Sequence, residues 1–397
     1  MQIDLKEAKH SILEATQKPL DVVHEAASQG LRMTVNGLLS LVIICSRHKL
    51  TTLAGLAFFQ LVQHMPEITD KLEEELYEDT LEAEVERNTQ ILNVRYGVEL
   101  AIGLSREAMG NLGIARWSEP GLSQKARASR WIIDELEQYP TEVIKQVGGL
   151  YRIMLANSLT SNDGEHMGGV ANNAEFAIEA GNSGWSTYLD EPIFKEVFHH
   201  EFGGHILDHA GNDDKSWVAQ NKDGNYFHSE GSCSALESAF FYWYGRDFVD
   251  CYAMKSPAED KAMITGSLYT AYNSLMRKAE KSTSIRDKVQ FRKTILYALS
   301  LGLMDKEYWQ HIQNKSLPTD YFESKRITLK DEKVETRIWR IMEKLRSEKL
   351  LTDSGSLMGD EALDYIELIL YAAYLDGGVK EEDYETDIQP LIEYAPI

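Results

Sequence analysis

The sequence predicts a predominantly helical α+β fold with one small sheet. Helical patterns fill roughly the first 120 residues and return beyond residue 315, whereas two strand-like segments, 148–159 and 168–182, occur together between them. Aliphatic and aromatic runs bounded by glycines are typical of strands. We therefore expect a helical N-terminal region (1–120), a mixed α/β domain (121–315) and a helical C-terminal region (316–397).

Net charge and cysteine content restrict the cellular compartment and the binding partners that we expect. The formal net charge of −22 argues against nucleic acid, because a phosphate binder needs a basic face. No basic segment followed by an apolar one opens the chain, so we expect a cytoplasmic protein, with secretion by a route without a signal peptide left open. The three cysteines lack the C-x-x-C spacing, which favours free thiols. Nothing in the sequence indicates an oligomeric state.

The N-terminal region contains one apolar stretch and one acidic stretch. The apolar runs within residues 35–65 are interrupted by Arg47, His48 and Lys49, and each is shorter than the ~20 residues that a spanning helix requires. We therefore expect a buried helical hairpin there and no membrane insertion. Residues 67–92 are acidic with apolar positions at helical spacing, which predicts a solvated amphipathic helix.

The middle of the chain predicts strands followed by helices. Pro120 and Gly121 break the helical pattern, and the segment RWIIDELEQYP predicts a helix that ends at residue 140. The strands GGLYRIMLANSL and FAIEA precede a helix with Asp190 as its N-cap and Pro192 in its first turn. Helices are then expected over 232–255 and 258–280, with a cap and first-turn pair at 256–257 between them, and over 361–375. His166 is expected in a surface loop.

The helix that starts near residue 190 carries HHEFGGHILDH, residues 199–209. In a regular helix, histidines four residues apart project about 40° from each other, whereas a spacing of five gives about 140°. His200 and His205 are five apart, so a regular helix would prevent them from sharing one ion. A π-bulge would realign them, and Gly203 and Gly204 lie inside the gap, where glycine permits an irregular backbone. The sequence therefore predicts a bulge between Glu201 and His205.

This stretch resembles the motifs of two families of zinc peptidases. HEFGGH is similar to the H-E-x-x-x-H motif of the dipeptidyl-peptidase III family, over these six residues. Over about residues 140–280, the order of two strands, HEFGGHIL (200–207) and FVDCYAMKSPAED (248–260) resembles the candidate zinc-binding metallopeptidases of bacteria, which have a zincin fold. The chain departs from them at the inserted glycine and at Met263, where many of these proteins have an acidic residue.

The resemblance implies a zinc-dependent peptidase of the glutamate-zincin type. It implies His200, His205 and Glu259 as Zn²⁺ ligands, Glu201 as general base and a peptide or protein as substrate. Asp260 would orient a ligating histidine through its second ring nitrogen. Tyr252 is the candidate for stabilising the oxyanion.

Several alternatives remain open from the sequence alone. Glu201, His205 and His209 fall on one face of a regular helix and form a rival ligand set, and the third ligand could instead be Glu237 or Glu230. The histidines could also belong to a helix in which they only hydrogen-bond locally. The functional alternatives are a pseudo-peptidase that acts as a binding module, and a secreted toxin or effector.

Overall fold

The computed structural model describes residues 78–172, 174–181, 191–209, 217–222 and 245–329, with isolated positions at 226, 233, 241, 336, 340, 341, 343 and 344. These residues belong to one compact unit that begins at Glu73. The hairpin expected at 35–65 and the helix expected at 361–375 lie outside the described residues. In the part of the chain that is described, no helix combines the length and the apolar character needed to cross a membrane.

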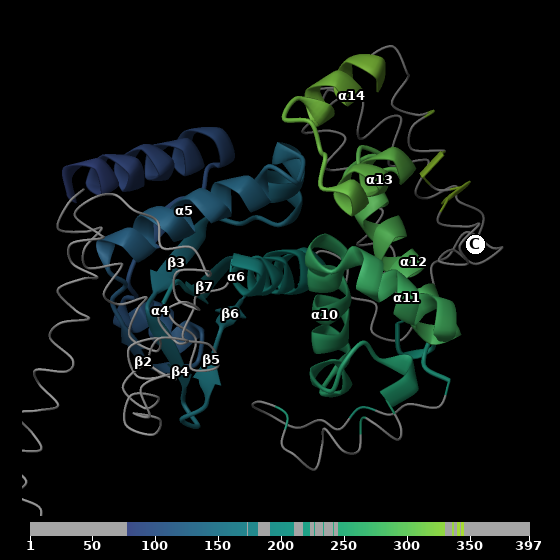
Figure 1. Ribbon diagram of the computed structural model, residues 1–397, viewed down its shortest axis with the longest axis horizontal. Helices are drawn as coiled ribbons and strands as arrows, with labels where there is room; N and C mark the ends of the chain where they lie inside the picture. The colour runs from purple at the N-terminus through teal and green to yellow at the C-terminus, as the bar shows by residue number, and fades with distance from the viewer. Residues whose placement is uncertain are drawn as a thin grey trace, which may run out of the picture. The chain divides into compact units, whose positions relative to one another are not determined.

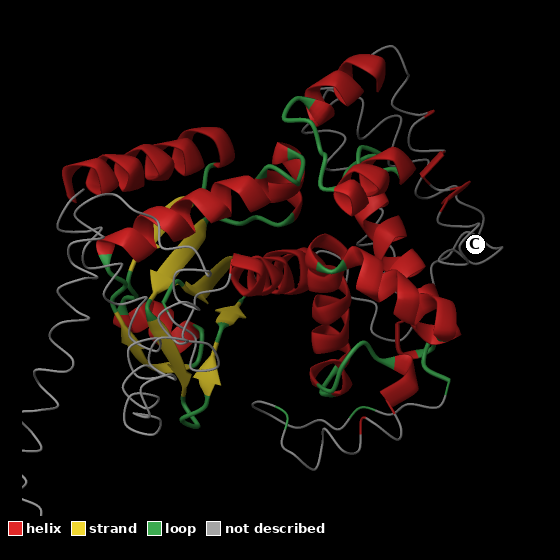
Figure 2. Ribbon diagram, viewed as in Figure 1, coloured by secondary structure: helices red, strands yellow, loops and turns green. Residues whose placement is uncertain are grey.

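The described chain is mostly helical, as expected of an α+β fold, but it contains two small sheets in place of the single sheet predicted (Figures 1 and 2). Residues 78–91 are helical, in agreement with the prediction for this part of 67–92. The helical elements that follow are η1 (Leu92–Tyr96), α4 (Arg106–Asn111), α5 (Leu122–Leu136), η2 (Val143–Val147), α6 (Glu191–Phe198), η3 (His199–Ile206), α7 (Leu207–His209), η4 (Gly245–Asp247), η5 (Tyr252–Met254), α10 (Pro257–Thr270), α11 (Tyr272–Lys281), α12 (Thr283–Leu299), α13 (Lys306–Asn314) and α14 (Tyr321–Leu329).

The first sheet has the strand order β1 (Glu99–Ile102), β3 (Arg152–Ala156), β7 (Glu175–Glu179), β6 (Gly169–Ala171). β1, β3 and β7 are parallel, and β6 runs antiparallel at the edge. The sequences RIMLA and EFAIE suit central strands because parallel strands are covered on both faces and are therefore apolar throughout. The strands predicted within 148–159 and 168–182 are thus confirmed.

The second sheet is antiparallel, in the order β2 (Ile114–Ser118), β4 (Ser158–Ser161), β5 (His166–Met167). Two sequence predictions are wrong here. β1 and β2 lie in the region predicted to be entirely helical, because their pairing with β3 and β4 provides hydrogen bonds that local sequence does not specify. His166 lies in a strand and not in a loop, and its Nε2 is 2.9 Å from Oε1 of the buried Glu179.

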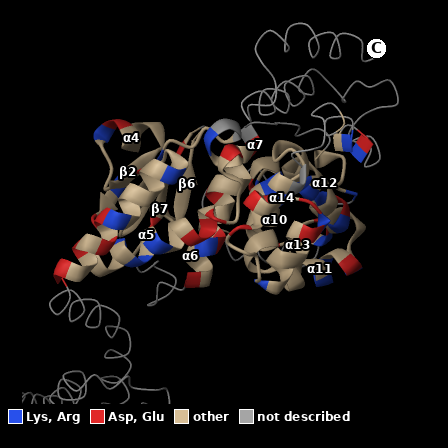
Figure 3. Cartoon of the chain, turned by 90° about the horizontal axis from the view of Figure 1, so that it is seen from above, with Lys and Arg blue, Asp and Glu red and all other residues tan. Residues whose placement is uncertain are grey.

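The helix that carries the histidines packs on the first sheet through its aromatic residues. Phe198 contacts Phe176 of β7 with ring centroids 5.6 Å apart, and Phe202 belongs to the same buried cluster. On the other side α10 packs along η3, and α5 packs against α6, where Lys195 pairs with Glu135. Figure 3 shows acidic and basic residues mixed along α5 and α6. The histidine helix is therefore held between a sheet and two helices.

The region after residue 232 differs from its prediction. Among the described residues, 245–254 form two short 3₁₀ turns in place of the continuous helix expected over 232–255. The carboxylate of Asp250 accepts the backbone N–H of Ala253, a local bond that competes with helix formation. The helix expected over 258–280 is divided into α10 and α11 at Ala271.

Two cysteines that were expected to be free thiols are paired. Cys233 and Cys251 form a disulfide across 18 residues, with Cα atoms 6.3 Å apart. This separation is within the range that a disulfide spans. Pairing of this kind depends on tertiary structure, so the sequence pattern could not reveal it. Cys45 lies outside the described residues.

Candidate metal centre

The predicted bulge in the histidine helix is confirmed. The helix begins as α6, continues as the π-helix η3 over His199–Ile206, and ends as the short α7. The wider turn of a π-helix absorbs the extra residue of the motif. As a result, Nε2 of His200 and Nε2 of His205 lie 3.2 Å apart.

The two glycines in the motif serve a purpose other than the one inferred from sequence. Neither is among the glycines with positive φ. A Cβ at Gly204 would lie 2.4 Å from Cα of Ala262, and a Cβ at Gly203 would lie 2.7 Å from the Tyr139 hydroxyl and 2.8 Å from Cγ2 of Thr265. These distances are too short for any side chain, so the glycines allow α10 and Tyr139 to approach the histidine helix closely.

That close approach brings Glu259 to the histidines. Ser256 is the N-cap of α10 and Pro257 its first residue, as predicted, and the Ser256 hydroxyl accepts the N–H of Glu259 at 3.2 Å. From this first turn, Oε2 of Glu259 lies 3.0 Å from Nε2 of His200 and 3.6 Å from Nε2 of His205. The helix N-terminus favours a negative charge at this position.

The three side chains offer the donor set and the spacing of a zinc site. Two imidazole nitrogens and a carboxylate oxygen all lie within 4.8 Å of one another. Ligands placed 2.0–2.1 Å from a tetrahedral zinc ion are separated by about 3.3 Å from each other. The observed separations of 3.0, 3.2 and 3.6 Å lie around that value. The residues present therefore fit a metal ion.

The charges and pKa values of the clustered side chains also favour a bound cation. Oε2 of Glu259 is buried and, within the described residues, no hydrogen-bond donor is directed at it, although Nε2 of His200 is 3.0 Å away. Burial raises the pKa of Glu259, but the two histidines outweigh it and hold this pKa well below its usual range. Burial lowers the pKa of His205, but Glu259 and Glu201 outweigh it and raise this pKa to about 9. His205 thus holds a proton at neutral pH, and a metal ion could replace its positive charge beside the Glu259 carboxylate.

Glu201 lies beside the cluster and reaches the edge of the first sheet. Its side chain is 5% exposed, and burial raises its pKa. A Cβ at Gly169 of β6 would lie 2.9 Å from Oε1 of Glu201, so this carboxylate contacts the edge strand directly. A carboxyl group with a raised pKa is suited to accept and return a proton near neutral pH.

Tyr252 lies near His200. Its ring centroid is 6.0 Å from that of His200. Burial and the nearby carboxylates of Glu259 and Glu201 raise the pKa of Tyr252, so its hydroxyl keeps its proton at neutral pH and can donate a hydrogen bond.

The role inferred for Asp260 is wrong. Its carboxylate accepts hydrogen bonds from Trp217 (2.9 Å), Tyr226 (2.9 Å) and Lys288, and none of these is a histidine. Successive helix residues project about 100° apart, so when Glu259 faces the histidines Asp260 faces the core. Asp260 is therefore part of a buried ion pair that holds α10 against α12.

Part of each rival proposal lies outside the described residues. Glu237 and Glu230 are not described, and neither is the side chain of His209, although its backbone belongs to α7. The described residues bring together the set His200, His205 and Glu259.

His199 is a residue whose importance the sequence reasoning missed. It is fully buried; Nε2 lies 2.7 Å from Glu135 and Nδ1 2.8 Å from the Tyr139 hydroxyl. Its ring stacks on that of Tyr269 at 4.0 Å. Burial lowers the pKa of His199, and a neutral ring donates from Nε2 to Glu135 and accepts from Tyr139. The signal was the His–His doublet, because adjacent helix residues cannot face the same ion.

Arg292 of α12 hydrogen-bonds to the backbone of the π-helix η3. It is buried; its guanidinium donates to the backbone carbonyl of Gly203, to Thr265 (2.9 Å) and to Asp208 (3.4 Å). Lys261 of α10 also pairs with Asp208, at 2.9 Å. One cation thus ties the π-helix to α10 and α12.

No protein-family model matches the chain, and no curated protein is significantly similar to it. Among solved structures, a candidate zinc-binding metallo-peptidase from Bacteroides caccae is 18% identical with a TM-score of 0.38, and the match covers 62% of this chain and 95% of that chain. A likeness at this level does not place the chain in a family.

Proposed function

We propose that the protein is a zinc-dependent hydrolase of peptide bonds, with His200, His205 and Glu259 as ligands. The observation that carries this proposal is the convergence of two imidazole nitrogens and one buried carboxylate oxygen within 4.8 Å of one another. Three protein ligands of this kind, with a position left for water, are the usual arrangement in catalytic zinc sites.

Bound zinc would lower the pKa of a water molecule to roughly 7. The remaining chemistry falls to side chains of this chain. Glu201 accepts the proton of the attacking water and returns it to the leaving amine, a use that fits its raised pKa. Tyr252 keeps its proton and donates a hydrogen bond to the oxygen of the attacked carbonyl.

The edge strand β6 supports a peptide as the substrate. β6 pairs with β7 on one side and ends the described sheet on the other, so its outer backbone groups can pair with an extended chain. Because Glu201 contacts Gly169 of this strand, a peptide added to β6 would pass beside the general base. This geometry favours peptide bonds over small-molecule substrates.

Metal analysis of the protein, purified without added metal, tests the proposal. We expect about one zinc per chain, lost in His205→Ala and in Glu259→Gln. Glu237→Gln and His209→Ala are matched controls that remove the rival ligands and should retain the zinc. Wild-type protein without zinc, or loss of zinc only in a control variant, would refute the ligand set.

Activity on a broad peptide library tests the base separately. Glu201→Gln should keep its zinc and lose activity by ~10²-fold or more. If the wild type binds zinc and cleaves no peptide, the protein is a binding module and the catalytic part of the proposal is wrong.

A further inference from the structure

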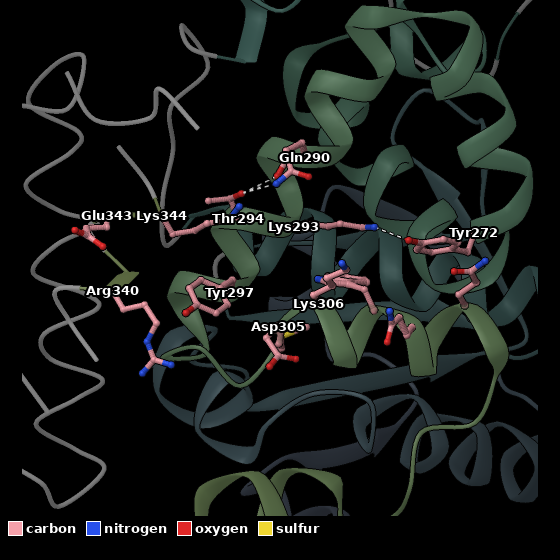
Figure 4. A pocket seen from close by; sticks show the side chains of 14 residues that line it. Tyr272, Gln290, Lys293, Thr294, Tyr297, Asp305, Lys306, Arg340, Glu343 and Lys344 are labelled. Atoms are coloured by element: carbon pink, nitrogen blue, oxygen red, sulfur yellow. Dashed lines mark hydrogen bonds between the residues drawn. The ribbon is translucent and has the colours of Figure 1, made fainter. Parts of the chain in front are cut away.

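A cavity of about 810 Å³, remote in the chain from the histidine motif, is lined by residues of α11, α12 and α13 and by Arg340, Glu343 and Lys344 (Figure 4). Its volume is within the ~300–1,000 Å³ range of small-molecule sites. It is built from helices other than η3 and takes no part in the chemistry proposed above. Its aromatic lining includes Tyr272, Tyr297 and Trp309, and four basic residues face two acidic ones across it: Lys293, Lys306, Arg340 and Lys344 against Asp305 and Glu343.

Lys293 is held in this cavity by aromatic rings. Its ammonium donates to the Tyr272 hydroxyl at 2.6 Å, and it lies 4.5 Å from the centroid of the Tyr272 ring and 5.2 Å from that of Trp309. Figure 4 shows Lys293 and Tyr272 pointing toward each other. Burial lowers the pKa of Lys293 to about 8. Its charge is therefore only partly compensated.

Half-buried Lys293 differs in its partners from Lys288 and Lys261, which are both fully buried. Lys288 pairs with Asp260 and Lys261 with Asp208, whereas no carboxylate pairs with Lys293 in the part that the structure describes. Asp305 lines the same cavity, but its carboxylate caps α13 and pairs with Lys325 at 2.7 Å. An ammonium group held without an anion is unfavourable unless a ligand supplies one.

Trp309, which lines the same cavity, also carries a polar group that is unsatisfied in the described part of the chain. The residue is 5% exposed, and its indole N–H is buried with no acceptor among the described residues. A buried donor without an acceptor carries a free-energy cost that native structures seldom accept. The lining thus contains an ammonium group without a carboxylate partner and a tryptophan whose indole N–H has no acceptor among the described residues.

We propose that this cavity binds a small organic anion. Its carboxylate or phosphate group accepts a hydrogen bond from Lys293, and its apolar body packs on the rings of Tyr272, Tyr297 and Trp309. The basic excess of the lining attracts an anion to a chain whose net charge is −22.

Calorimetric titration of the full chain with phenylacetate and with phenyl phosphate tests the proposal. We expect 1:1 binding of at least one probe, and the tighter one identifies the anionic group. Lys293→Met keeps most of the side-chain volume and should weaken binding by ~10-fold to ~100-fold, because it removes a charged hydrogen bond. Lys306→Met, at an exposed lysine of the same lining, is the matched control and should change affinity by less than ~3-fold.

Thermal unfolding without ligand separates binding from folding. Lys293→Met should melt at the same temperature as the wild type or higher, because a half-buried charge without a carboxylate partner among the described residues is lost. It should also lose the increase in melting temperature that the probe gives the wild type. The proposal is overturned if neither probe binds, if Lys293→Met binds as tightly as the wild type, or if inorganic phosphate binds as tightly as phenyl phosphate.

Discussion

Replacement of Gly204 by alanine should separate the two helices that form the candidate metal centre. The added Cβ would lie 2.4 Å from Cα and 2.5 Å from Cβ of Ala262, whereas ordinary contacts begin at 3.4 Å. One of the contacted atoms is a backbone atom, so no side-chain rotation relieves the clash. We therefore expect α10 to move away from η3 by about 1 Å.

This displacement has a small effect on stability and a large one on metal binding. Overpacking costs ~1–3 kcal/mol, and the better helix propensity of alanine returns ~1 kcal/mol, so the net loss is between about 0 and 2 kcal/mol. Metal–ligand distances tolerate only about ±0.2 Å. A shift of about 1 Å at Glu259 exceeds that tolerance, and we expect zinc affinity to fall by ~10-fold to ~100-fold.

Competition with a chelator measures the zinc affinity, and urea unfolding of the metal-free protein measures the stability. Gly110→Ala is the matched control: it is a helical glycine of α4 with nothing within 4 Å of the added Cβ. It should stabilise the protein by up to ~1 kcal/mol and leave zinc affinity unchanged. If Gly204→Ala behaves like Gly110→Ala in both assays, close packing at Gly204 does not position Glu259.

Three further predictions concern the support of the fold. Burial raises the pKa of Glu179 to about 8, so the folded state holds a proton that the unfolded state releases, and stability falls as the pH rises from about 4.5 to 8. In urea unfolding, Glu179→Gln should therefore be more stable than the wild type by up to ~3 kcal/mol at pH 7 and equally stable at pH 4. An equal gain in stability at both pH values would contradict this. Arg292→Met should destabilise the protein by ~3–5 kcal/mol and weaken zinc binding, both measured as above, and unchanged zinc affinity would exclude its support of the bulge. Cys233 and Cys251 should resist alkylation in denaturant until reduced, and reduction should cost ~3 kcal/mol of stability; alkylation before reduction would show that they are not paired.

The histidine motif shows how much of the site the sequence contains. Its five-residue spacing can serve one ion only if the helix is irregular, so the π-helix could be predicted from a local angle. The reason for Gly203 and Gly204 could not, because the atoms that exclude a side chain belong to Tyr139, Ala262 and Thr265, more than 50 residues away in the chain. Local rules predict the shape of an element, whereas tertiary contacts decide which neighbour it meets.

The same difference between local sequence and tertiary contacts explains why the role of Asp260 was predicted wrongly and why the partners of His199 were missed. Asp260 is adjacent to Glu259, and a motif-based comparison treats the two carboxylates as one functional unit. Its partner Lys288 is 28 residues distant, and Glu135 is 64 residues from His199. Buried ion pairs of this kind join different helices, so no periodicity within one helix reveals them.

The position of Glu259 results from a local and a tertiary constraint that act together. The Ser256 cap makes Glu259 the third residue of α10, where a glutamate commonly turns back to hydrogen-bond the N-cap. Here its carboxylate instead turns to His200 and His205, because Gly204 lets α10 approach η3 closely enough for that contact. At the helix N-terminus the carboxylate is favoured as an anion, and two imidazoles hold its pKa low. A carboxylate that is ionised and already in position needs little reorganisation to bind a cation, so we expect the candidate centre to depend as much on Gly204 as on its three proposed ligands.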